Sequence, residues 1–132
     1  GHTRMTRTRQ TALVAEDNSA LLRVIAFTLR KEGFVVTTAS NGEAAWDVAR
    51  SDTFDLIVTD YQMPRLNGLE LVDRLREDER FATTPVVLLT AKGLELDADR
   101  LREEYGVAAV LIKPFSPTEL GQLVSRLSVQ PV

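Results

Sequence analysis

Five short apolar runs, separated by longer segments with apolar residues at helical spacing, limit most strongly how this chain can fold. Each run is rich in Val, Leu, Ile or Thr, which favours a buried strand. The strands are expected near 12–16, 34–39, 55–59, 85–90 and 108–112. Because the runs are continuously apolar, both faces of the sheet are predicted to be covered, as in parallel sheets built from βαβ units.

Between these runs, the apolar spacing predicts five helices. They are expected near 19–31, 43–51, 67–79, 94–105 and 120–127. In the first, Ser19 is the expected N-cap and Gly33 the stop. Trp46 and Phe81 are expected to pack helices rather than to anchor a ligand. Strand–helix units joined by right-handed crossovers predict a doubly wound parallel sheet with helices on both faces.

Length and composition limit the function classes. A chain of 132 residues that is 44% hydrophobic is long enough to form one core. The absence of cysteine excludes a disulfide framework and a thiolate metal site, and agrees with a cytoplasmic location. A net charge of −3 argues against direct nucleic-acid binding, and the apolar runs are too short for membrane insertion. We expect 11–129 to form one domain, after a disordered basic tail at 1–10 that is partly an expression scar.

Polar side chains stand at the ends of four predicted strands. They are Glu16 and Asp17 after the first strand, Asp60 after the third, Thr90 at the end of the fourth and Lys113 after the fifth. Parallel strands end at the same edge, where α/β sheets bind ligands, so these side chains are expected to share one pocket. Taken alone, each has an ordinary explanation as a helix cap, turn acid, strand hydroxyl or surface lysine. Their joint position favours a functional site.

Three acids in one pocket require a cation. Two carboxylates about 5 Å apart repel by roughly 3 kcal/mol at an effective dielectric of about 20. With oxygen ligands and no His or Cys nearby, Mg²⁺ is the expected ion. A carboxylate beside Mg²⁺ can attack phosphorus and form an acyl phosphate, and Asp60 is the candidate nucleophile. Lys113 and Thr90 are expected to bind phosphoryl oxygens, and the added charge to bias a two-state surface.

Four segments together resemble the receiver domain of bacterial two-component response regulators, over about 11–128. They are Glu16-Asp17, the D-x-x-M-P-x-x-x-G segment from Asp60 to Gly68, Leu89-Thr90-Ala91 and Lys113-Pro114-Phe115. The order and spacing of all four make the resemblance specific. It implies a flavodoxin-like fold with five strands in the order 2-1-3-4-5 and a cis peptide bond before Pro114.

The resemblance also implies roles for the acidic residues. Asp60 would accept a phosphoryl group from a sensor histidine kinase, a phosphotransfer protein or a small phosphodonor. Asp17 and Asp60, with the backbone carbonyl of Gln62, would bind Mg²⁺ directly. Glu16 would act on the metal through water.

Signal output is implied by the same resemblance. Lys113 and Thr90 would contact the phosphoryl group and alter an output face at 93–128, which would bind a downstream protein or output domain. The chain would be a signalling switch and not an enzyme, although it would assist its own phosphorylation and dephosphorylation. Pairing with a second copy is left open.

Two positions depart from the family pattern. Glu16 stands where Asp is commoner, which keeps the charge and adds a methylene. Val110 stands where receivers usually carry Tyr or Phe, whose ring swings inward as the Thr moves. Tyr105 is a poor substitute, because it lies on the preceding predicted helix. Val110 therefore motivates an alternative function, an atypical receiver that binds a partner constitutively and couples weakly to phosphorylation.

Two other classes share part of the pattern. A flavodoxin needs a phosphate-cradling loop after its first strand, whereas Glu16 and Asp17 would repel the phosphate of FMN. A phosphatase with an aspartyl intermediate would place its nucleophile on a D-x-D turn, and Asp60-Tyr61-Gln62 lacks the second acid. The phosphoacceptor switch is therefore the leading hypothesis.

Overall fold

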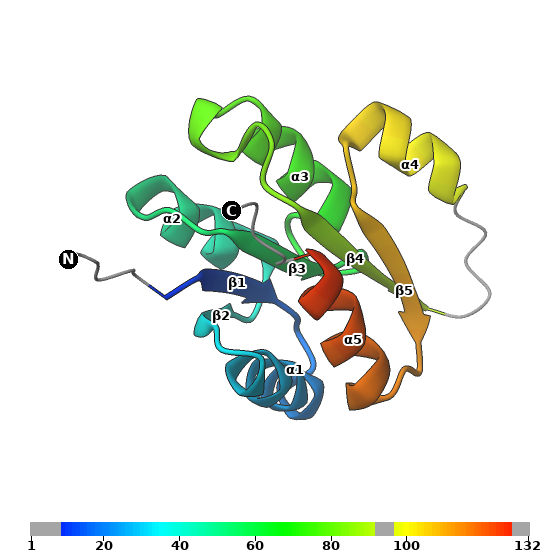
Figure 1. Cartoon of the computed structure of the whole chain (residues 1–132). Coiled ribbons are helices and arrows are strands. Elements are labelled where there is room, and N and C mark those ends of the chain that lie inside the picture. Colours follow the sequence, from blue (N-terminus) through cyan, green and yellow to red (C-terminus); the bar gives the residue numbers. More distant parts are fainter. Residues whose placement is uncertain (1–8, 92–96, 128–132) are drawn as a thin grey trace, which may run out of the picture.

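The computed structural model describes residues 9–91 and 97–127, which form a parallel sheet between two layers of helices (Figure 1). The strands are β1 Thr11–Ala15, β2 Val35–Ala39, β3 Leu56–Asp60, β4 Val86–Ala91 and β5 Ala109–Lys113. Their order across the sheet is β2-β1-β3-β4-β5, and every neighbouring pair is parallel. The predicted doubly wound sheet and its strand order are confirmed.

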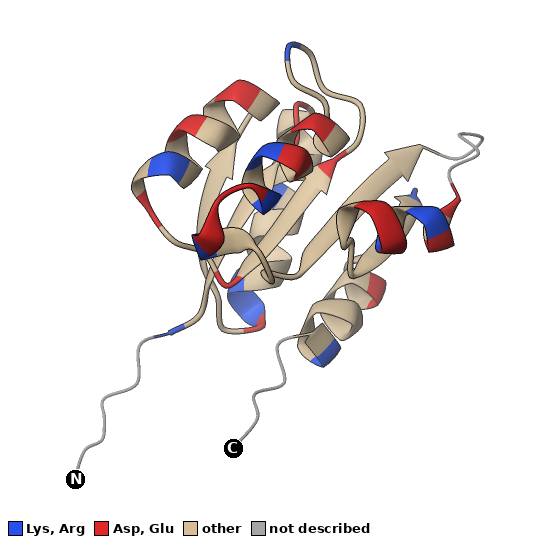
Figure 2. Cartoon of the chain, turned by 90° about the horizontal axis from the view of Figure 1, so that it is seen from above, with Lys and Arg blue, Asp and Glu red and all other residues tan. Residues whose placement is uncertain are grey.

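Helices cover both faces of this sheet. They are α1 Ser19–Lys31, α2 Gly42–Ser51, α3 Gly68–Arg76, α4 Ala98–Tyr105 and α5 Pro117–Leu127, with a 3-10 turn, η1, at Glu79–Phe81. Figure 1 shows α1 and α5 on one face and α2 and α3 on the other, with α4 beside β5. Acidic and basic segments are interspersed along α3 and α4 (Figure 2). Within the described residues, no helix has the length and apolar character needed to cross a membrane.

Alternate residues of each central strand serve opposite cores. On β1, Leu13 packs in the core under α2 and α3, whereas Val14 packs in the core under α1 and α5. Full burial of such a side chain stabilises the fold by about 1.5–3 kcal/mol. Phe81 is fully buried and Trp46 partly buried in the first of these cores, so both pack helices as predicted. A two-sided core explains why these strands read as continuous apolar runs.

Several predicted boundaries differ from the structure. The N-cap of α1 is Asn18 and not Ser19, because the Asn18 side-chain oxygen accepts the backbone N–H of Leu21 at 2.9 Å. The third helix ends at Arg76 rather than near 79, and Asp78 caps the 3-10 turn that follows. Gly33 lies after the end of α1 with a φ of 99°, as a stop residue requires. The predicted start of the fourth helix, near 94, lies outside the described residues.

Two glycines allow the loop between β3 and α3 to pack against its neighbours. A Cβ on Gly68 would overlap the backbone oxygen of Asp60, and one on Gly42 would overlap the backbone oxygen of Leu66. Arg65 in the same loop has a φ of 74°, a left-handed conformation uncommon for a residue with a side chain. The loop that follows Asp60 is therefore held close to β3 and to the start of α2.

Candidate functional site

The predicted site residues lie at the carboxyl end of the sheet, which is called the pocket end below. Glu16 and Asp17 follow β1, Asp60 ends β3, and Thr90 and Lys113 lie at the ends of β4 and β5. The strand registers bring these ends level, since Ala15 pairs with Thr59 and Ala91 with Lys113. Sequence reasoning therefore placed each side chain at the correct edge.

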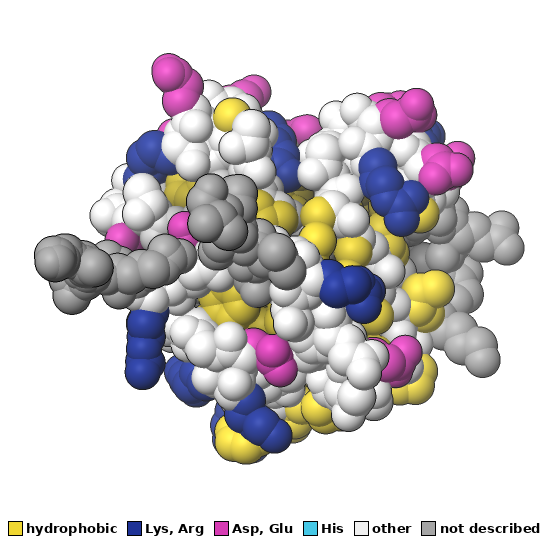
Figure 3. All heavy atoms as spheres, viewed as in Figure 1, with side chains coloured by type: hydrophobic (Ala, Val, Ile, Leu, Met, Phe, Trp, Pro, Cys, Tyr) yellow, Lys and Arg dark blue, Asp and Glu magenta, His cyan; other side chains and the backbone are white. Residues whose placement is uncertain are grey.

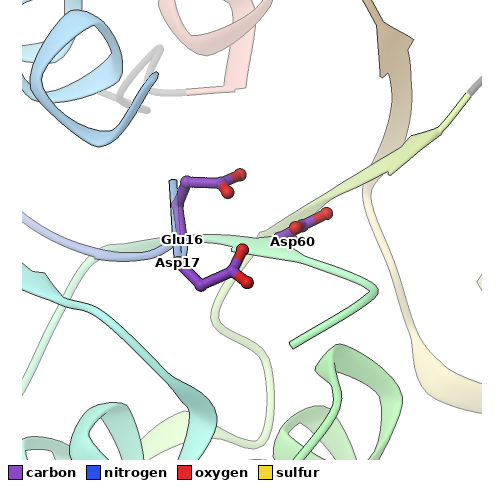
Figure 4. Close-up of side chains that lie close together, drawn as sticks. All are labelled: Glu16, Asp17 and Asp60. Carbon is purple, nitrogen blue, oxygen red and sulfur yellow. The ribbon is translucent and has the colours of Figure 1, made fainter. Parts of the chain in front are cut away.

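Three carboxylates converge in this pocket. Glu16, Asp17 and Asp60 each offer an oxygen within 4.8 Å of the others, and their side chains point into the same space (Figure 4). Glu16 is 0% and Asp60 4% exposed, whereas Asp17 is exposed. An all-oxygen donor set that is open on one side fits a hard divalent cation such as Mg²⁺.

Lys113 supplies the positive charge opposite these acids. Its Nζ lies 3.0 Å from Oε1 of Glu16 and 3.1 Å from Oδ2 of Asp60. Burial alone would lower the pKa of Lys113, but the contacts with Glu16 and Asp60 outweigh burial and raise it. The ammonium is therefore protonated at neutral pH and lies next to the candidate nucleophile. The peptide bond between Lys113 and Pro114 is cis, as the resemblance implied.

Glu16 is the most enclosed of the three acids. The backbone N–H of Asn18 donates to its Oε2 at 3.0 Å, and its own N–H donates to the backbone oxygen of Ala39. Burial raises the pKa of the Glu16 carboxyl, and repulsion from Asp60 adds to this, against the opposing effects of Asn18 and Lys113. Sequence reasoning predicted a water-mediated metal contact for Glu16 and missed its ion pair with Lys113. The signal was the longer side chain itself, where Asp is commoner.

Thr90 is buried beside this cluster. Its side-chain hydroxyl has no hydrogen-bond partner within the described ranges 9–91 and 97–127. An unpartnered buried hydroxyl is uncommon and suits a group that gains a partner in another state of the protein. Its strand, β4, pairs with β3 and β5, which carry Asp60 and Lys113.

Main-chain hydrogen bonds position the backbone just after Asp60. The N–H of Tyr61 donates to the oxygen of Leu89 at 2.7 Å, and the oxygen of Tyr61 accepts the N–H of Gly68 at 2.8 Å. At the start of α3, Asn67 and Glu70 form a reciprocal capping box, which sequence reasoning did not predict. The role of the Gln62 carbonyl as a metal ligand stays a prediction.

Val110 occupies the position where an aromatic ring was expected. It is half-buried against Leu88, Leu101 and Val107 between β4 and α4. Tyr61 and Tyr105 pack against the same cluster. The space near Val110 is thus lined with aliphatic side chains and bordered by two tyrosines from other elements.

Comparison with protein families supports the geometry. The family model of the response regulator receiver domain matches residues 12–125. The chain is 47% identical over 115 residues to the hybrid signal transduction histidine kinase D of Dictyostelium discoideum. The matched region covers 87% of this chain and 7% of that protein. It spans about half the length of other curated relatives, which are transcriptional or response regulators.

Solved structures are similar over nearly their full length. The chemotaxis response regulator CheY4 of Vibrio cholerae is 28% identical, with a TM-score of 0.82 and coverage of 91% of this chain and 99% of that one. The receiver domain of the sensor histidine kinase PA1611 of Pseudomonas aeruginosa PAO1 is 32% identical, with a TM-score of 0.77 and coverage of 90% and 97%. That structure has a magnesium ion coordinated in its active site cleft.

Proposed function

Because this chain belongs to the response regulator receiver domain family, we propose that it is a Mg²⁺-dependent phosphoacceptor switch that is phosphorylated on Asp60 by a sensor histidine kinase or phosphotransfer protein. The observation that carries the proposal is the position of the Lys113 ammonium, 3.1 Å from a carboxylate oxygen of Asp60 at the carboxyl end of β3. A positive charge beside this oxygen supports its assignment as the attacking atom.

The reaction proposed is phosphoryl transfer to a carboxylate. An oxygen of Asp60 attacks phosphorus, the bond from phosphorus to the donor nitrogen or oxygen breaks, and an acyl phosphate forms. With a phosphohistidine donor, the leaving group is the imidazole, which takes up a proton. With acetyl phosphate, the leaving group is acetate. Lys113 binds an oxygen of the transferred group, and the buried Thr90 hydroxyl gains a partner by donating to another. These contacts replace the interaction between Lys113 and Asp60.

Magnesium would be held by Asp17 and Asp60, with the Gln62 carbonyl as a further ligand. When bound, it would neutralise charge on the phosphoryl oxygens during transfer. The three carboxylates outnumber the Lys113 ammonium, so the pocket has negative charge to offer a divalent cation. This excess charge supports the metal assignment.

The proposal is tested by intact-mass measurement after exposure to acetyl phosphate and Mg²⁺. Wild type is expected to gain one phosphoryl group, and Asp60→Asn none. Asp73→Asn, a matched change at an exposed acid on α3, is expected to be phosphorylated like wild type. Absence of an adduct on wild type, or an undiminished adduct on Asp60→Asn, contradicts the proposal.

A second candidate function is a constitutive interaction module with weak coupling to phosphorylation. Val110 favours it, because no ring at that position can follow Thr90. Hydrogen exchange of 98–113 before and after phosphorylation separates the two. A switch changes exchange in α4 and β5, whereas a constitutive module takes up the phosphoryl group without that change.

The output surface is proposed on the 93–128 face, of which 97–127 is described. On β5, Ile112 is 56% exposed, and hydrophobic side chains are visible along this strand in Figure 3. An exposed apolar residue on an edge strand suits a protein partner, either a downstream domain or a second copy of this chain. We place the protein in the cytoplasm, where kinase and phosphodonor are available.

A further inference from the structure

A groove runs between α1 and α5, which lie side by side on one face of the sheet (Figure 1). We propose that this groove is a binding site for an amphipathic anion, a carboxylate with an acyl chain, whose headgroup is bound by Arg23 and whose chain lies along Val24 and Phe27. Asp60 and Lys113 do not line the groove, so it is separate from the carboxylate pocket. The inference goes beyond the proposed phosphoacceptor function and does not depend on it.

The groove has the size and the apolar surface of a small-molecule site. Its volume is about 1020 Å³, close to the upper end of the range for ligand pockets, roughly 300–1,000 Å³. Phe27 is 62% and Val24 42% exposed, and both line the groove. A Cβ on Gly121 of α5 would lie 3.7 Å from Cγ2 of Thr28 on α1, so the missing side chain keeps the space between the helices open. A ligand that covers this surface gains the free energy of apolar burial.

The charge around the groove has the opposite sign to that of the whole chain. The net charge of the chain is −3, whereas α1 contains no Asp or Glu. The charged residues that line the groove are Arg23, Lys31, Arg126 and Glu32. Three cations and one acid attract an anion to this face. They disfavour a second copy of the chain as the occupant, because two such grooves would repel each other.

The cation proposed to bind the headgroup is available. Within the ranges 9–91 and 97–127, the side chain of Arg23 forms no ion pair and no hydrogen bond. Thr118, the second residue of α5, lines the same end of the groove, where α1 and α5 both begin. The partial positive charge at the start of each helix adds to that of the guanidinium.

The opposite end of the groove is closer to neutral. Lys31 and Arg126 lie in the last turns of α1 and α5, where Glu32 and the negative ends of the helix dipoles offset them. One effective cation therefore remains, at Arg23. This favours a ligand with a single headgroup over a partner surface with several acids.

The apolar surface has the length of a medium acyl chain. Along α1, which rises about 1.5 Å per residue, Phe27 lies about 6 Å and Lys31 about 12 Å from Arg23. A carboxylate of about ten carbons, with bonds of about 1.5 Å, spans this distance. The Lys31 ammonium lies 5.7 Å from the centroid of the Phe27 ring, so its aliphatic stem borders the end of the chain.

The first test uses decanoate below its micelle concentration and ¹H–¹⁵N NMR of the full chain. Decanoate is expected to cause saturable shifts of the backbone signals of α1 and α5. Octanoate should bind about fourfold more weakly, because it lacks two methylenes that the open groove half buries. Decyltrimethylammonium, which has the same chain length and a positive headgroup, should cause no saturable shift in α1 or α5.

The second test uses variants of exposed residues, which are expected to fold. Arg23→Gln should weaken decanoate binding by about fivefold and Phe27→Ser by about tenfold. The matched controls are Arg74→Gln and Val35→Ser, at an exposed cation and an exposed apolar residue outside the groove. Both controls should bind decanoate like wild type.

The proposal is overturned if decanoate causes no saturable shift, or if Arg23→Gln and Arg74→Gln have equal effects. It is also overturned if an acidic helical peptide or phosphatidylglycerol vesicles shift α1 and α5 while monomeric decanoate does not, since the groove would then belong to a protein or a membrane. Asp60→Asn should bind decanoate like wild type, so failure of the proposed phosphorylation would leave this test in force.

Discussion

The two ends of the sheet treat charged side chains in opposite ways. At the pocket end, Glu16, Asp60 and Lys113 bind mainly to one another. At the other end, which we call the far end, Arg76 makes all its hydrogen bonds to main-chain oxygens. Its guanidinium donates to the backbone oxygens of Phe81, Thr84, Tyr105 and Gly106, at 2.6–3.1 Å.

Arg80 repeats part of this pattern, although its guanidinium also forms an ion pair with the Asp78 side chain at 2.7 Å. Its guanidinium donates to the backbone oxygens of Ala49 and Asp52, at and just beyond the end of α2. Nearby, the Asp55 carboxylate accepts the backbone N–H of Thr11 at 2.8 Å. Main-chain groups at the ends of helices and strands lack partners within their own element, and charged side chains supply them here.

The comparison shows that charged side chains satisfy main-chain atoms at the far end and face one another at the pocket end. At the far end each charged group satisfies main-chain atoms, so its removal leaves those atoms unpaired. At the pocket end, three carboxylates face one ammonium, so an excess of negative charge remains. Mutations and ligands at the two ends are therefore expected to change stability in opposite directions.

The largest effect is expected from Arg76→Leu. It removes four hydrogen bonds that join α3 to η1, to Thr84 before β4 and to the end of α4, and we expect the free energy of unfolding to fall by about 3 kcal/mol. Arg74→Leu, on the same helix but exposed, is the matched control and is expected to change little. Urea unfolding measures both. Equal effects of the two substitutions would remove the special role of the far end.

A ligand effect of similar size and opposite sign is expected at the pocket end. Mg²⁺ at a hundred times its dissociation constant should raise the free energy of unfolding by about 2.7 kcal/mol, because it binds the folded state. The gain should be largely absent in Asp17→Asn at the same Mg²⁺ concentration. Chelation with EDTA should return wild type to its starting stability. A Mg²⁺-independent melting temperature would show that the excess negative charge recruits no cation.

How far the sequence predicts each end follows from the same contrast. The grouping of the residues at the pocket end was predictable because each follows or ends a strand. In a parallel sheet, these strand ends lie at the same edge. The role of Arg76 could not be predicted from the sequence, since its partners are main-chain oxygens up to 30 residues away and carry no side-chain signal. Asn18 was missed as the N-cap because the adjacent Ser19 is an equally good cap by type, and only the backbone geometry distinguishes them.

A smaller, stabilising effect is expected from Glu16→Gln in metal-free buffer. Burial, followed by repulsion from Asp60, raises the pKa of Glu16, so its ionised form is less favourable in the folded chain than in the unfolded one. Replacing it with a neutral amide is expected to stabilise the protein at pH 8.

The sign of the pH dependence follows from the same raised pKa. The folded chain binds the Glu16 proton more tightly than the unfolded chain, so acid favours the folded state at this residue. Wild type should therefore gain stability relative to Glu16→Gln as the pH falls from 8 toward 5. Asp17, Asp60 and Lys113 are the same in both proteins. The difference between their denaturation midpoints should shrink with acid. A difference that grows would mean that Lys113 outweighs burial.

The smallest effect is expected where charge belongs to neither end. Asp99 and Arg102 form an ion pair of 3.1 Å on the exposed side of α4, with 90% and 52% of their side chains exposed. Water screens such a pair and both side chains lose freedom in forming it, so Arg102→Ala should change the free energy of unfolding by less than about 0.5 kcal/mol. Added salt should alter it little further. This ion pair has nearly the same length as the one between Lys113 and Asp60. A negligible effect of Arg102→Ala would therefore show that the distance between the charges does not decide the effect on stability. The opposite effects at the two ends would then come from burial and from the main-chain or carboxylate groups around each charge.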